Sequence, residues 1–195
     1  MERLYRQIAE YTPYNRQEAA DKALMLAFMD RNPDALYRDN LAGHFAATAW
    51  VVNRDRTKVL MIYHNIYKSW AWAGGHADGD SDLLAVARRE IEEETGLADI
   101  KLLCDGIFAI NVLCVERHIK KGRPVACHLH LDVEYLFEAD DSLPLRIKED
   151  ENSAVGWVDI ADIDTAVTEE KMKPVYALLC EKMKKYKKNS ISKIL

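Results

Sequence analysis

The sequence predicts a mixed α/β sandwich, in which helices cover a sheet of mixed strand direction, with a helical extension before it. Residues 2–40 are rich in helix-forming residues, whereas residues 45–158 alternate short β-branched and aromatic runs with polar turns and one helical segment. Residues 169–188 repeat apolar side chains at helical spacing. Because these elements interleave without the regular βα rhythm of a parallel sheet, a mixed sheet fits better.

Size and composition indicate one core with an appendage. A chain of 195 residues that is 49% hydrophobic and 30% charged can bury one sizeable core. We therefore divide it into a helical extension packed on the core, residues 1–42, and a main domain, residues 43–195. The formal net charge of -5 argues against a nucleic-acid polymer as partner, since such binding depends on Lys and Arg neutralising phosphates.

The chain carries no sign of secretion or membrane insertion. Its four cysteines are widely spaced and form no CxxC pair, which favours reduced thiols over a disulfide framework or a zinc knuckle. No apolar run approaches the roughly 20 residues of a membrane span. We expect a cytoplasmic protein without a membrane partner.

The helical extension has two predicted helix starts. Asn15 is followed three residues later by Glu18, in the pattern of a capping box. Asn32 precedes Pro33, and proline is favoured in the first turn of a helix. We therefore expect one helix to begin after Asn15 and another after Asn32.

The strands follow in order. Residues 45–52 and 59–63 are expected to pair as a hairpin across the polar turn between them, and residues 70–73 form another short strand. Longer strands are expected at residues 102–113 and 125–138. A strand ending near Trp157, a short helix at 160–167 and the amphipathic helix at 169–188 complete the chain.

The strand at residues 125–138 alternates cleanly in polarity. Because successive side chains of a strand point to opposite faces, it has one apolar and one polar face. The apolar face consists of Leu129, Leu131, Val133, Tyr135 and Phe137, and the polar face of His128, His130, Asp132 and Glu134. We expect the first face to join the core and the second to be solvated or functional.

A glycine-rich loop leads into an acidic helix. Gly74, Gly75 and Gly79 precede the helical residues 82–95, and Gly96 is placed to end that helix. Such a loop lets backbone groups approach an ion or a phosphate closely. Asp80 or Ser81 is expected to cap the first turn.

The acids of this helix converge on one side. At about 100° per residue, Glu90, Glu93 and Glu94 fall within about a third of a turn, whereas Glu92 points away. Crowded carboxylates favour a hard divalent cation such as Mg²⁺, which prefers oxygen ligands and keeps waters that a phosphate can displace. Arg89, four residues before Glu93, is expected to pair with it.

The loop and helix together closely resemble the signature of the Nudix hydrolase family. Eight of its fixed positions occur at the expected spacings: Gly75, Arg89, Glu90, Ile91, Glu93, Glu94, Gly96 and Leu97. At the ninth, Ser81 stands where the family usually has its first glutamate, with Asp80 and Asp82 beside it. The signature covers about an eighth of the chain, and the flanking strand pairs also look like those of Nudix proteins.

The resemblance implies a fold and a chemistry. It implies a Nudix-type α/β/α sandwich with a mixed sheet, to which the N-terminal helices are an addition. Glu90, Glu93 and Glu94, with the Gly75 carbonyl, would bind Mg²⁺ or Mn²⁺, and Arg89 would orient Glu93. Water would attack a phosphorus of a nucleoside diphosphate linked to another group.

The general base has two candidate positions, because Nudix enzymes take it either from the signature or from a late loop. Glu90 is the candidate within the signature. In the late loop, residues 148–153, Glu151 is preferred because it lies shortly before the strand at Trp157.

Histidines are the candidate ligands of the substrate. His128 and His130 share one strand face, and His76 follows the signature's first glycine directly. We expect these three to contact the substrate. Two histidines at alternate strand positions can also bind zinc when a third ligand converges, and His44 and His64 lie near strand ends where a phosphate could reach them.

The partner expected is a small-molecule diphosphate, with room left for a homodimer. Sugar nucleotides, dinucleotides and oxidised nucleotides all fit the predicted reaction. A different class is a Nudix-fold sensor that binds a nucleotide without turnover, which only Ser81 favours. A third is an isomerase of prenyl diphosphates, but no placement of cysteine and glutamate recommends it.

Overall fold

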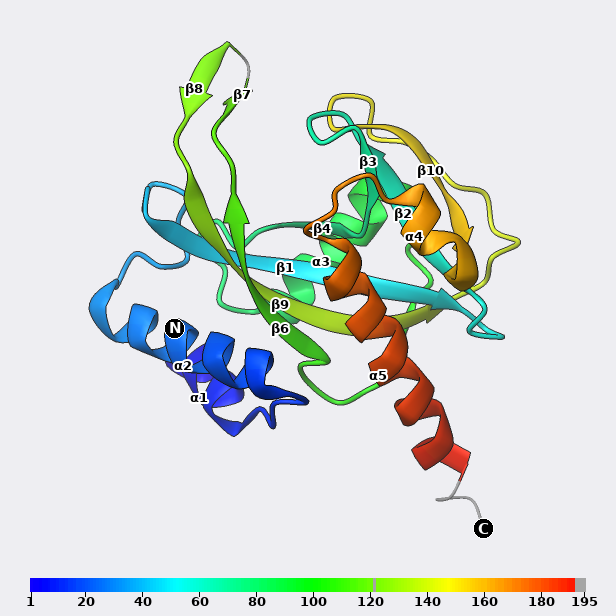
Figure 1. Cartoon of the computed structure of the whole chain (residues 1–195), viewed down its shortest axis with the longest axis horizontal. Coiled ribbons are helices and arrows are strands. Elements are labelled where there is room, and N and C mark those ends of the chain that lie inside the picture. Colours follow the sequence, from blue (N-terminus) through cyan, green and yellow to red (C-terminus); the bar gives the residue numbers. More distant parts are fainter. Residues whose placement is uncertain (121, 192–195) are drawn as a thin grey trace.

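The computed structural model describes residues 1–120 and 122–191. A mixed sheet of eight strands forms its centre, and a separate two-stranded ribbon projects from it (Figure 1). The strands of the sheet are β1 Gly43–Asn53, β2 Lys58–His64, β3 Ser69–Ala71, β4 Ala73–His76, β5 Lys101–Leu102, β6 Ala109–Val115, β9 His128–Ala139 and β10 Asn152–Asp159. The ribbon pairs β7 His118–Lys120 with β8 Arg123–Val125.

The two longest strands run parallel and hold the sheet together. β1 and β9 pair from Gly43↔Leu129 to Asn53↔Ala139, and the order along the sheet is β10-β2-β1-β9-β5. The other pairs are antiparallel, including β3 on β2, β4 on β1 and β6 on β9. The predicted mixed sheet and the hairpin of β1 and β2 are confirmed.

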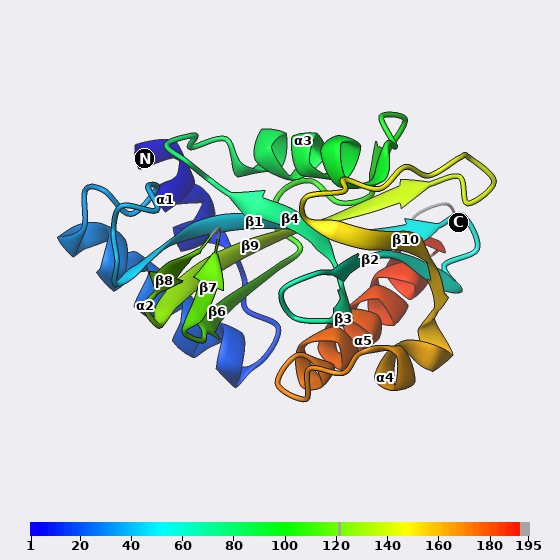
Figure 2. The same ribbon diagram turned by 90° about the horizontal axis from the view of Figure 1, so that it is seen from above.

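Helices cover both faces of the sheet. Figure 2 shows α3, Leu83–Thr95, on one face and α4, Ile163–Ala166, with α5, Lys173–Ile191, on the other. A short 3₁₀ turn, Ile160–Asp162, precedes α4. The apolar core is divided in the same way: one cluster packs α3 against the sheet, and a second packs α5 against it through residues such as Trp50 and Tyr176. This is the predicted α/β/α sandwich.

The N-terminal helices are α1, Glu2–Glu10, and α2, Arg16–Arg31, at the end of the sheet away from β10 (Figures 1 and 2). Their apolar side chains Leu4, Ile8, Met25 and Met29 join the same core cluster as α3. The Asn15 side chain accepts a hydrogen bond from the Glu18 N–H, as the capping pattern predicts.

The helix expected after Asn32 does not form. Asn32 instead ends α2, and its side-chain amide donates to the Phe28 carbonyl. The residues after it make turns, so that Ala35 and Leu36 become buried beside α2. Proline at the first helical position permits a helix but does not require one.

The prediction of one continuous strand at residues 102–113 was wrong. The segment is divided into β5 and β6, which both pair with β9, and the chain between them turns at Gly106, where φ is 95°.

Within the described residues, no helix is long and apolar enough to cross a membrane.

The polar face of β9 is not solvated along its length. Asp132 and Glu134 alternate with apolar residues as predicted, but they are 3% and 0% exposed because helices cover both sides of the sheet. Burial raises the pKa of Asp132 to about 7. Glu134 accepts a 2.6 Å hydrogen bond from the Asn111 side chain. Alternation therefore identified the two faces but not what covers the second.

Candidate active site

Gly74 and Gly75 lie in a strand, not in a flexible loop as predicted. Gly74 and Gly75 belong to β4 and pair with Thr48 and Ala47 of β1. The Gly74 N–H donates to the Glu94 carboxylate at 2.9 Å. The sheet therefore delivers these backbone groups to the acidic helix α3 at a fixed position.

Gly75 leaves room for a carboxylate. A Cβ atom at this position would overlap the carboxyl carbon of Glu90, so any larger residue would displace that side chain. The absence of a side chain here brings the main chain of β4 against the acid of α3. This close approach is the local reason for glycine at the first signature position.

We expect Gly75→Ala to lower turnover by about 100-fold while the protein stays folded, since Glu90 is a flexible side chain that can move away but then leaves its working position. Activity and thermal melting of the purified variant measure the two effects. Gly156→Ala in β10 is the matched control, because its new Cβ would meet Trp70 at an ordinary 3.7 Å. Equal activities of the two variants would contradict the role of this contact.

Helix α3 begins and ends at defined residues. Its N-cap is Asp82, whose carboxylate accepts from the Ala85 N–H at 3.2 Å, so neither Asp80 nor Ser81 is the cap. Asp80 instead accepts from the Asp82 N–H, one step outside the helix. Gly96 ends the helix in the left-handed region at φ 78°, as predicted.

The burial of the acids of α3 agrees only in part with the predicted grouping, because Glu93 is exposed like Glu92. Glu94 is 3% exposed and Glu90 is half-buried, whereas Glu92 and Glu93 are exposed. Burial, aided by the charges of Glu90 and Glu151, raises the pKa of Glu94 to about 8 although Gly74 donates to it. Burial and then the charge of Glu93 raise the pKa of Glu90. A cation beside these two carboxylates would favour their ionised forms.

A lysine joins the signature to the late loop. Lys148 Nζ lies 3.1 Å from the Glu93 carboxylate and 2.7 Å from that of Glu151. Glu151 is thereby brought to the acids of α3, where its charge also acts on Glu90 and Glu94. Sequence reasoning missed Lys148, which had no signal beyond its place in the predicted acidic loop.

The predicted pair of Arg89 with Glu93 is not present in the structure. Arg89 Nη1 lies 3.7 Å from the Asp80 carboxylate, and Glu93 pairs with Lys148 instead. Asp80 therefore has a structural partner, and Asp82 is engaged as the helix cap. The two acids beside Ser81 are thus both occupied.

The N-terminal extension reaches the signature. Arg38 makes two hydrogen bonds to the Asp78 carboxylate, and the Gly79 N–H donates to the Leu36 carbonyl at 2.9 Å. Arg38 also interacts electrostatically with Glu90 and Glu151, and with His44. No sequence signal identified it.

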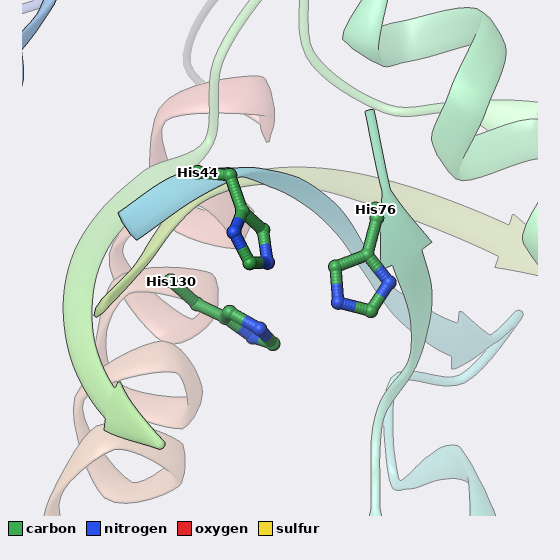
Figure 3. Close-up of side chains that lie close together, drawn as sticks. All are labelled: His44, His76 and His130. Carbon is green, nitrogen blue, oxygen red and sulfur yellow. The ribbon is translucent and has the colours of Figure 1, made fainter. Parts of the chain in front are cut away.

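The predicted substrate histidines gather at a different place. His76, His128 and His130 are brought together with His44, and ring centroids of neighbouring pairs are 4.9 to 5.1 Å apart. Figure 3 shows His44, His76 and His130 directed toward one another. Since His76 follows Gly75 in β4, its side chain points to the face opposite Glu90. The histidines and the acids therefore occupy the two faces of β4.

The donor set of the acidic site fits a divalent cation. Glu90 lies against Gly75 and Glu94 against Gly74 of β4, Lys148 links Glu93 with Glu151, and burial followed by neighbouring negative charge raises the pKa of Glu90 and of Glu94. Hard cations take ligands of this kind.

Comparison with known proteins identifies the family. The family model of the NUDIX domain matches residues 43–179. An RNA pyrophosphohydrolase from Pelagibacter ubique is 28% identical over 141 residues, which make up 69% of this chain and 87% of that protein.

Solved structures share the fold. A Caenorhabditis elegans Ap4A hydrolase in a binary complex superposes with a TM-score of 0.54 at 17% identity, over 74% of this chain and 98% of that chain. The NUDIX domain of Shewanella oneidensis NrtR, complexed with ADP ribose, superposes with a TM-score of 0.52 at 18% identity. The match covers 82% of this chain and 96% of that chain. With the matching family model over most of the chain and the signature acids assembled at β4, this protein belongs to the Nudix family of hydrolases.

Proposed function

We propose that this protein is an Mg²⁺- or Mn²⁺-dependent hydrolase that cleaves the diphosphate bond of a nucleoside diphosphate linked to another group. The observation that carries the proposal is the contact of Glu90 with Gly75 and of Glu94 with Gly74, both acids having a raised pKa, while Lys148 links Glu93 with Glu151. A cluster of this charge needs a cation, and a cation held by carboxylates can bind phosphate oxygens.

The roles follow from the positions. Glu90, Glu93, Glu94 and the Gly75 carbonyl would hold the ion, which when bound supplies positive charge to the phosphate oxygens as the phosphorus–oxygen bond breaks. Glu94 is fixed by the Gly74 N–H, so it is the most rigid of the three acids. Lys148 sits between Glu93 and Glu151 and holds the late loop against α3.

Two carboxylates remain candidates for the general base. Glu151 carries an ion pair with Lys148, which favours its ionised form, as a proton acceptor requires. Burial and neighbouring charge favour the protonated form of Glu90 until a cation binds. We therefore propose Glu151 as the base, with Arg89 supporting the first turn of the site through Asp80.

The proposed substrate is a small molecule. The proteins named above act on or bind nucleotide-derived compounds: RNA, Ap4A and ADP ribose. The net charge of -5 disfavours a polyanionic chain, so we propose a small nucleotide in place of RNA.

Three expectations stay predictions: the division into residues 1–42 and 43–195, a homodimer and a cytoplasmic location.

A substrate screen tests the proposal. The protein is incubated with Mg²⁺ and ADP-ribose, Ap4A, sugar nucleotides, nucleoside triphosphates or a short RNA with a 5′ triphosphate, and released phosphate and nucleoside monophosphate are measured. We expect turnover of at least one small nucleotide, complete loss with a chelator, and recovery when Mg²⁺ is restored. Turnover that persists without divalent ions would contradict the proposal.

A nucleotide sensor without turnover is the second candidate. Ser81 at the first glutamate position favours it. The same screen separates the two, since a sensor would bind one of the compounds tightly in calorimetry and release no product from any of them.

We expect Ser81→Glu to be tolerated and to lower the Mg²⁺ concentration that gives half-maximal activity. The change adds a carboxylate where its neighbours Asp80 and Asp82 are engaged with Arg89 and the helix N-terminus. Ser81→Gln, which has the same length without the charge, is the control and should leave the Mg²⁺ dependence unchanged. Loss of activity in Ser81→Glu alone would show that the chain uses this position differently.

A further inference from the structure

Four histidines from three neighbouring strands form a cluster outside the acidic site. His44 comes from β1, His76 from β4, and His128 and His130 from β9. One ring nitrogen each from His44, His76 and His130 lies within 4.8 Å of the other two (Figure 3). The strand pairing fixes this arrangement, because His44 is opposite His130 and His76 is opposite Ala46.

The His44 ring is oriented as a ligand. It is 4% exposed, and its Nδ1 lies 3.3 Å from the Asn40 carbonyl, to which it donates. Its Nε2 is therefore unprotonated and faces the cluster, where it has no hydrogen-bond partner within the described part of the chain and no access to solvent. A buried hydrogen-bond acceptor that is left without a partner lowers the stability of the fold by roughly 1–3 kcal/mol. A backbone carbonyl behind one ring nitrogen, with the other free for a metal, is the usual arrangement of a ligating histidine.

His128 is oriented in the same way. Its Nδ1 lies 2.9 Å from the Ala126 carbonyl, and its Nε2 lies 3.3 Å from the Nε2 of His130. A tetrahedral zinc ion with nitrogens at 2.0–2.1 Å separates its ligands by roughly 3.3–3.4 Å. The His128 and His130 nitrogens are already at that spacing. The ring nitrogens of His44, His76 and His130 lie up to 4.8 Å apart, so the widest of these distances must shorten by at most about 1.5 Å to reach that spacing. Rotation of the rings can supply this movement.

The protonation state of the cluster suits a metal better than a phosphate. His44 is 4% exposed and three further histidine rings lie beside it, and both burial and crowding disfavour a charged imidazolium. Neutral imidazole ligates a metal without first losing a proton, whereas a phosphate site would need rings that carry positive charge. Four crowded imidazolium rings would also repel one another.

We propose that His44, His76 and His130 bind a late first-row transition-metal ion of the Zn²⁺ type, with His128 as the fourth ligand. Imidazole nitrogen favours such ions, and carboxylate oxygen favours Mg²⁺. The two faces of β4 thus carry two sites of different preference: oxygen ligands beside Gly75 and nitrogen ligands at His76. The second site does not depend on the function proposed for the first, and it ties β1, β4 and β9 together at one end of the sheet.

Metal titration of the full-length protein tests this proposal. The protein is stripped with a chelator and returned to excess Mg²⁺, and Co²⁺ is then added while its visible absorption is followed, since tetrahedral nitrogen ligation gives an intense band. We expect a single equivalent to bind, Zn²⁺ to displace it, and Zn²⁺ to raise the melting temperature. The variants are His76→Gln and His130→Gln, whose rings are only half-buried, with circular dichroism to check that they fold.

Two controls assign the ion to the cluster. His118→Gln removes a histidine of the separate ribbon, and Glu93→Gln removes an acid of the other site. Both should bind Co²⁺ as the wild type does, while His76→Gln and His130→Gln lose more than about 100-fold in affinity. The proposal fails if the wild type gives no tetrahedral band, if folded His76→Gln and His130→Gln retain it, or if Glu93→Gln abolishes it. Binding of inorganic phosphate that is lost with these histidines, without Co²⁺ binding, would equally overturn it.

Discussion

Glu94→Gln is expected to abolish more than 99% of turnover and to make the metal-free protein more stable. Turnover falls because Glu94 is the acid that Gly74 fixes beside the proposed ion, and loss of a direct ligand should exceed the 10- to 100-fold cost of losing an outer partner. Stability rises because Gln has the same shape and carries no charge into a position that is 3% exposed.

The gain in stability should depend on pH. The pKa of Glu94 rises from 4.5 to about 8 on folding. The buried carboxyl therefore costs no folding free energy below pH 4.5, and its cost increases as the pH approaches 8, because the unfolded chain is ionised there and the folded one resists ionisation. The difference in melting temperature between Glu94→Gln and wild type, measured without divalent ions, should therefore widen from pH 5 to pH 8. Addition of Mg²⁺ should stabilise the wild type and not the variant.

Glu134→Gln is the matched control, since Glu134 is also fully buried with a raised pKa but lies on β9, away from α3. It should raise the melting temperature of the metal-free protein and keep its activity. A Glu94→Gln variant that turns over substrate at the rate of Glu134→Gln would remove Glu94 from the ion site.

The largest loss of stability is expected from Lys182→Met. Lys182 of α5 is 8% exposed, and its Nζ contacts Glu18 at 2.6 Å, the Tyr11 hydroxyl at 2.7 Å and the Phe108 carbonyl at 2.6 Å. Without it, the carboxylate of Glu18 is buried without a cation, which costs about 3–5 kcal/mol. For a chain of this length, the melting temperature should fall by about 10 °C or more.

The double variant Glu18→Leu, Lys182→Met tests the electrostatic origin of that loss. Removing both charges leaves no uncompensated ion, so most of the lost stability should return. Lys184→Met on the exposed side of α5 is the control and should melt within about 1 °C of the wild type. A single Lys182→Met variant that melts with the control would show that the bridge between α2 and α5 contributes nothing.

The parts of the fold that sequence predicted well depend on neighbours along the chain. Asn15 caps α2, Gly96 ends α3, and the acids of α3 face one side because these features are set within one or two helical turns. The resemblance implied that the Gly75 main chain shares an ion with Glu90 and Glu94; in the structure Gly75 contacts Glu90, and Gly74 donates to Glu94.

The parts that sequence could not predict depend on contacts between distant segments. Lys148 reaches Glu93 across 55 residues, and Arg38 reaches Asp78 across 40. A lysine or arginine in a polar loop has no pattern that distinguishes such a role from exposure to solvent. His44 was one histidine among several until the parallel pairing of β1 and β9 placed it opposite His130. Alternation in β9 could not show that α5 would cover Asp132.

The most direct test of the central claim, that acids on one side of α3 hold a catalytic divalent ion, compares two adjacent glutamates. Glu93 contacts Lys148 on the side of the acidic cluster, whereas Glu92 is exposed and points away. Mn²⁺ binding by calorimetry and Mg²⁺-dependent turnover are measured for Glu92→Gln and Glu93→Gln. We expect wild-type behaviour for Glu92→Gln and loss of both binding and turnover for Glu93→Gln. Equal behaviour of the two variants would contradict an ion site on this side of α3.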